Sequence, residues 1–147
     1  MNDVTAFIRL SRRDRELLLR AMGTLCVCWI RIRIQGVEKL EHWALQRGEG
    51  GVSVEELNKA VDIAAKRFPR STCLQRALAL QRMLALNGHP SQLRIGVQRS
   101  GEQFLAHAWL VKEGRTLIGD SELEKYHVLF SWGSAKEEEE RTRRRKA

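Results

Sequence analysis

The stretch that decides the fold reads Arg70-Ser71-Thr72-Cys73-Leu74-Gln75-Arg76-Ala77-Leu78-Ala79-Leu80. Thr72 is a preferred N-cap residue, and the apolar residues after it recur at helical spacing, so the pattern predicts a helix that begins at Cys73. The pair Asn87-Gly88 is typical of a helix C-terminus. A helix N-terminus offers unpaired N–H groups and a partial positive charge, and both favour the thiolate form of a cysteine placed there.

A second informative stretch follows that helix and reads Phe104-Leu105-Ala106-His107-Ala108-Trp109-Leu110. Both faces of this stretch are largely apolar, which predicts a central strand covered on both sides. The residues at 93–97 alternate between apolar and polar or small side chains, which is typical of a half-buried strand. A turn at 99–102 joins the two strands, and we expect shorter strands at 116–118 and 127–132.

A cysteine, a histidine and an aspartate then follow one another as Cys73, His107 and Asp120. A nucleophilic thiol needs a base within hydrogen-bond reach, and the base needs a third group that fixes its tautomer. A hairpin that returned over the helix N-terminus would bring the first two together. Other interpretations stay open: Cys73 and His107 can be core residues, Asp120 can cap a turn, and His127 is the second candidate base.

The N-terminal half carries helical patterns, with helices predicted over residues 11–34, 37–46 and 53–68. Ser11 is an N-cap residue, and Ser53 opens a capping box. Residues 30–34 alternate as a strand would, but the absence of proline favours one continuous helix. Its face around Leu25 and Trp29 lies against the core or, alternatively, against a partner or a membrane surface. The chain is therefore predicted to be α+β, with a helical N-terminal half packed on a small antiparallel sheet.

The length of 147 residues and an apolar content of 43% are enough for one domain with a helical extension. We expect a helical N-terminal extension at 1–68, a catalytic core at 69–135 and a charged tail at 136–147 that is either disordered or a solvated helix. The tail holds six basic and four acidic residues, net +2, so the body keeps +6 of the formal +8. A basic end without interleaved aromatic residues is weak evidence for nucleic-acid binding, and we expect none.

The three cysteines are an odd number, which argues against a disulfide framework and fits a reducing compartment. Cys26 and Cys28 would point about 200° apart on a helix, so they suit the core or a helix flank better than one metal ion. We expect no metal and no cofactor. No apolar run reaches the roughly 18 residues that span a bilayer, and the start lacks an export pattern. We therefore expect a cytoplasmic protein without a membrane span.

Residues 69–130 resemble the transglutaminase-like leader peptidases of lasso peptide biosynthesis, also called stand-alone B or B2 proteins. The resemblance rests on four motifs: Cys73-Leu74-Gln75-Arg76-Ala77-Leu78-Ala79-Leu80, Asn87-Gly88-His89, Leu93-Arg94-Ile95-Gly96-Val97 and Ala106-His107-Ala108-Trp109. It implies a papain-like cysteine protease core. It also implies roles for three residues: Cys73 as nucleophile, His107 as general base and acid, and Asp120 as orienting acid, with Glu122 in reserve.

The resemblance also implies a substrate and partners. The substrate would be a ribosomally made precursor peptide, cut between leader and core. Residues 1–68 read as helices and not as a fused leader-recognition domain, so a separate leader-recognition (B1-type) protein is expected. The resemblance also implies a downstream ATP-dependent macrolactam synthetase, which needs the freed N-terminus of the core. This chain shows no Walker-type glycine-rich loop. Two alternatives remain: a transamidase with the same three residues, and a non-catalytic basic scaffold.

Overall fold

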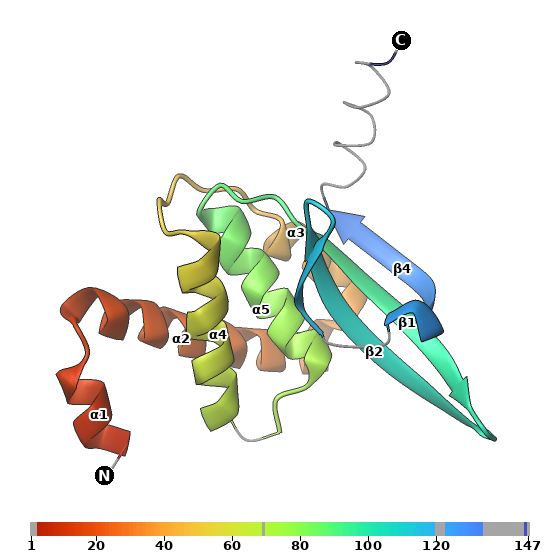
Figure 1. The fold of residues 1–147 in the computed structure, drawn as a ribbon, viewed down its shortest axis with the longest axis horizontal. Helices are drawn as coiled ribbons and strands as arrows, with labels where there is room; N and C mark the ends of the chain where they lie inside the picture. The colour runs from red at the N-terminus through yellow and green to blue at the C-terminus, as the bar shows by residue number, and fades with distance from the viewer. Residues whose placement is uncertain (1–2, 69, 120–122, 134–145, 147) are drawn as a thin grey trace.

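In a computed structural model, the chain is described at residues 3–68, 70–119, 123–133 and 146. Helices gather on one side and an antiparallel sheet on the other, with α5 between the remaining helices and the sheet (Figure 1). The helices are α1 (Asp3–Arg9), α2 (Arg12–Gln35), η1 (Val37–Leu40), α3 (Glu41–Ala44), α4 (Val54–Arg67), α5 (Cys73–Leu86) and η2 (Leu123–Lys125). The strands are β1 (Gln92–Ser100), β2 (Gln103–Lys112), β3 (Arg115–Ile118) and β4 (His127–Gly133). The predicted α+β class is confirmed.

The predicted helix boundaries follow from the caps. The Ser11 hydroxyl accepts a hydrogen bond from the Asp14 N–H at the start of α2, and Gly36, with φ of 76°, ends that helix. The strand-like alternation at 30–34 is helical, as expected. The predicted helix at 37–46 is instead a 3₁₀ turn, η1, followed by the short α3. The helix α1 was not predicted, because its residues carry little periodicity.

The four strands lie in the order β3-β2-β1-β4, all antiparallel. The prediction that β2 is covered on both faces is wrong for its first half. Phe104 is 73% exposed, whereas Ala108, Trp109 and Leu110 are buried. The reason is that the β1–β2 hairpin extends beyond the helices, so only the second half of the strand reaches them (Figure 1).

One hydrophobic core joins the helices to the sheet. Its fully buried members include Leu25 of α2, Val61 of α4, Leu78 of α5, Leu93 of β1 and Leu110 of β2. Within the ranges that the structure describes, no helix combines the length and the apolar character needed to cross a membrane.

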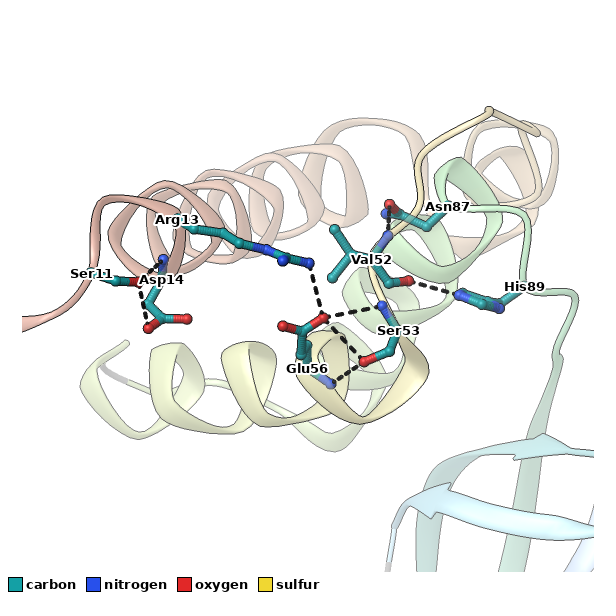
Figure 2. A network of polar contacts seen from close by, with 8 residues as sticks. All are labelled: Ser11, Arg13, Asp14, Val52, Ser53, Glu56, Asn87 and His89. Carbon is teal, nitrogen blue, oxygen red and sulfur yellow. Dashed lines mark hydrogen bonds and ion pairs between the residues drawn. The ribbon is translucent and has the colours of Figure 1, made fainter.

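Polar contacts fix the entry into α4 (Figure 2). Ser53 and Glu56 form the predicted capping box, and the Arg13 guanidinium of α2 donates to the same Glu56 carboxylate at 3.3 Å. The Asn87 side chain accepts from the Val52 N–H, and a ring nitrogen of His89 lies 2.8 Å from the Val52 carbonyl. The loop before α4 is therefore held at the C-terminal end of α5.

Candidate functional site

An open cavity of about 1070 Å³ lies where α4, the N-terminus of α5, β2, β3 and η2 meet. Cys73 and His107 both line it. These residues are 34 positions apart in sequence, on different layers of the fold. The structure thus brings two of the three predicted catalytic residues to one cavity.

Cys73 is the first residue of α5 and is half-buried. The Thr72 hydroxyl caps the helix by accepting a hydrogen bond from the Gln75 N–H at 3.2 Å. The buried Gln75 side chain donates to the Leu25 carbonyl of α2 at 2.9 Å, which holds this end of α5 against α2. Unpaired N–H groups at such a helix terminus are suited to hydrogen-bond an oxyanion that forms next to the thiol.

His107 lies in β2 opposite Gly96 of β1. Its ring stacks on Trp109, with the ring centroids 6.1 Å apart and the planes at 22°, and lies 5.3 Å from the Tyr126 ring. Trp109 is buried, so the His107 ring packs against a side chain of the protein interior. Among the described residues, no hydrogen bond joins the Cys73 thiol to the His107 ring. This is compatible with a catalytic pair, because catalytic hydrogen bonds commonly tighten only when substrate is bound.

Two glycines make room for the Trp109 side chain. A Cβ on Gly96 would lie 3.0 Å from Cη2 of Trp109, and a Cβ on Gly119 would lie 2.5 Å from its Cβ. Gly119 also has φ of +94°, a conformation that side chains disfavour. The glycine of the Ile-Gly-Val motif therefore leaves room for two neighbours: the His127 carbonyl oxygen of β4, 2.9 Å from such a Cβ, and the tryptophan of the Ala-His-Ala-Trp motif.

Asp120 and Glu122, the candidates for the orienting acid, lie outside the described residues. Gly119 and Leu123, on either side of this segment in sequence, both line the cavity. The assignment of the third residue stays a prediction.

Sequence reasoning missed an ion pair in the cavity wall. The Arg76 guanidinium of α5 donates to Asp62 of α4 at 2.8 Å, and Lys66 pairs with the same carboxylate at 3.1 Å. Arg76 lies one helical turn after Cys73, and that spacing could have singled it out. Its Nε is buried without a hydrogen-bond partner. Tyr126 was also missed, because no local pattern connects it to His107.

The remaining sequence candidates lie elsewhere. His127, the second candidate base, is exposed on β4 and does not line this cavity. Cys28 is fully buried on α2, as predicted for a core residue, and burial raises the pKa of its thiol to about 12. Within the described ranges, no cluster of histidine, cysteine and acidic side chains is arranged to hold a metal ion.

Comparison with known proteins identifies the family. A family model described as the transglutaminase-like superfamily matches residues 19–131. The chain therefore belongs to the transglutaminase-like superfamily, which includes cysteine peptidases and transamidases. No curated protein and no solved structure gives a significant match.

Proposed function

We propose that this chain is a cysteine peptidase that removes the leader from a lasso precursor peptide. One observation carries the proposal: Cys73, at the N-terminus of α5, and His107, on β2, line the same open cavity. Superfamily membership adds support, since the superfamily includes enzymes that work through a cysteine. The motifs shared with lasso leader peptidases support the choice of substrate.

In the proposed reaction, His107 takes the proton of the Cys73 thiol, and the sulfur attacks the carbonyl carbon of the last leader residue. The N–H groups at the start of α5 hydrogen-bond the oxyanion of the tetrahedral intermediate. His107 then protonates the leaving amine, which frees the core peptide and leaves a thioester on Cys73. Water, deprotonated by His107, hydrolyses the thioester, releasing the leader carboxylate and restoring the thiol.

Asp120 is proposed to accept a hydrogen bond from the His107 ring and so to fix its tautomer, with Glu122 as the alternative. A separate leader-recognition protein would present the precursor. A macrolactam synthetase would consume the core, because ring closure needs its new amino group. A cytoplasmic location is part of this proposal, since the precursor is made on ribosomes.

The experiment that tests this proposal is leader cleavage followed by mass spectrometry. The purified chain is mixed with the precursor and the leader-recognition protein encoded beside its own gene. We expect wild type to release leader and core, and Cys73→Ala to lose cleavage by more than about 10³-fold, as expected when a covalent nucleophile is removed. The matched control is Cys26→Ala, a half-buried cysteine of α2 that does not line the cavity, which should cleave as wild type does.

Two other outcomes would contradict the proposal. Equal cleavage by Cys73→Ala would make Cys73 a structural residue. No cleavage by wild type, with a precursor and partner that a related peptidase can process, would favour the basic scaffold.

An added amine, such as glycine amide, distinguishes a transamidase from a peptidase. A transamidase would transfer the leader acyl group from the thioester to the amine, which shifts the mass of the leader product.

A further inference from the structure

The long helix α2 carries an apolar surface on the side that faces away from the core. Four exposed side chains form it, together with a glycine, and we name this set the outer stripe: Leu19, Gly23, Val27, Ile30 and Ile34. The spacing of three and four residues places all five on one helix face. Leu19 is 60% exposed and Ile34 is 76% exposed. The opposite face is buried, so α2 is apolar on two sides although the described chain covers only one.

Gly23 lies at the middle of α2, where glycine is less favourable than alanine. A Cβ at this position would meet nothing within 4 Å, so packing inside the chain does not require glycine here. A glycine does allow the backbone of another element to approach closely. Its position in the outer stripe therefore suits a second helix that crosses α2 at this point.

The charge of α2 restricts what that second helix can be. The helix holds six arginines and two acidic residues, net +4, and both acids, Asp14 and Glu16, lie near its start. Residues 17–35 contain Arg20, Arg31 and Arg33 and no acidic residue. A second copy of the chain would set two positive helices against each other. An acidic helix would be complementary to the arginines that flank the stripe, Arg20 and Arg33.

We propose that the outer stripe is the docking surface for an acidic amphipathic helix of a partner protein, which crosses α2 at Gly23. The partner's apolar face would cover Val27 and Ile30, and its acidic flanks would lie near Arg20 and Arg33. This inference rests on α2 alone and does not depend on the peptidase proposal. Flat anionic membranes and a second copy of the chain are the competing occupants, and the experiment below distinguishes them.

The probes are two helical peptides of about 20 residues, long enough to be helical, that share a leucine stripe and carry either glutamate or lysine on the polar face. Binding to the full chain is measured by fluorescence anisotropy at low and at high salt. We expect the glutamate peptide to bind at least about tenfold more tightly than the lysine peptide, with an advantage that shrinks in high salt.

Three variants localise the binding. Gly23→Leu fills the crossing point and should abolish binding, yet raise the melting temperature by about 3 °C because leucine favours the helix. Ile30→Glu should abolish binding through charge and loss of apolar contact. The control Ile8→Glu, at a residue of α1 that is 62% exposed, should bind as wild type does.

Several results would overturn the inference. One is equal affinity for the two peptides, or binding that Gly23→Leu leaves unchanged. Another is a dimer in analytical ultracentrifugation that Ile30→Glu dissociates, which would make the stripe a self-association surface. A third is binding to phosphatidylglycerol vesicles, lost in Ile30→Glu, with no affinity for the glutamate peptide.

Discussion

Trp109 shows how single residues hold the candidate base. Its indole ring is buried behind the His107 ring, and it fits there because Gly96 and Gly119 have no side chains. His107 itself is half-buried and lies where the exposed first half of β2 passes into its buried second half, so Trp109 is a buried neighbour that can support its ring. A change at either glycine should therefore reach His107 through the tryptophan.

We expect the methyl group of Gly96→Ala to press on the His127 carbonyl and on Trp109. The variant should therefore reduce kcat for the proposed leader cleavage by about tenfold or more, because small misplacements of a catalytic group are costly. The overpacking should also lower the free energy of unfolding by about 1–3 kcal/mol. Kinetics and urea unfolding measure the two effects. The matched control is Gly51→Ala, where a Cβ meets nothing within 4 Å. If both variants behave alike, Gly96 does not position the site.

The buried Cys28 thiol makes the free energy of unfolding depend on pH, and stability should fall in alkaline solution. Burial raises the pKa of this thiol to about 12 in the folded chain, whereas the pKa of a free thiol is about 8.5. Between these values the unfolded chain releases a proton that the folded chain keeps. The contribution of this thiol to the free energy of unfolding is therefore complete below about pH 8.5. It is lost as the pH rises towards about 12, by up to about 1.4 kcal/mol per pH unit.

This dependence is measured by urea unfolding between about pH 9 and pH 11. Cys28→Ala should be less stable at neutral pH, since it leaves a cavity, but should lose most of the alkaline slope. Val61→Ala, which also creates a core cavity, should keep the slope of wild type. A slope that survives in Cys28→Ala would assign the alkaline loss to other groups.

At the scale of elements, one carboxylate at the start of α4 accepts hydrogen bonds both from its own helix cap and from another helix. Glu56 accepts from the Ser53 N–H and hydroxyl, and also from Arg13 of α2 (Figure 2). Sequence alone predicted the capping box but not the link to α2. That link ties the entry of α4 to the helix that carries the outer stripe.

We expect Ser53→Ala to lower the free energy of unfolding by about 1 kcal/mol, the usual cost of losing an N-cap. The melting temperature should fall by about 2–4 °C. Thermal unfolding followed by circular dichroism measures this, with the exposed Ser100→Ala as control. The double variant with Glu56→Ala should lose less than the sum of the single losses, since both residues belong to one network. Additive losses would show that the two side chains act separately.

At the scale of the whole molecule, α5 joins the layers through two buried amides. Gln75 donates to the Leu25 carbonyl of α2. Gln81 donates to the Ser91 carbonyl before β1 and accepts from the Trp132 indole of β4. The helix that carries Cys73 is thus bound to α2 at one end and to the sheet at its middle.

We expect Gln81→Leu to cost about 2–3 kcal/mol of unfolding free energy, because it leaves both the Trp132 N–H and the Ser91 carbonyl without this partner. Gln75→Leu should cost about 1 kcal/mol, since the Leu25 carbonyl can still accept within its helix. Urea unfolding measures both, with Gln35→Leu, at an exposed position, as control. Equal losses of unfolding free energy in the two variants would contradict the inference that Gln81 contributes more than Gln75 by holding α5 to the sheet.

The helices and strands could largely be predicted, because caps and periodicity are local signals. Ser11, Ser53 and Thr72 begin the helices they were expected to begin. Cys73 and His107 line one cavity, as a hairpin that returns over the helix N-terminus would allow, and their catalytic roles stay predictions. What could not be predicted depends on distances across the fold. The exposure of Phe104 follows from how far the hairpin extends. The contact of Tyr126 with His107 joins residues 19 positions apart, which no local pattern connects.

The stack of His107 on Trp109 also gives the candidate site a built-in optical signal. Because the His107 ring lines the cavity and stacks on Trp109, the emission of Trp109 should change when a peptide in the cavity moves the His107 ring. Trp29, Trp43 and Trp132 add a background that Trp109→Phe identifies by subtraction. The entry of a peptide into this site can thus be followed in the unlabelled protein, in real time.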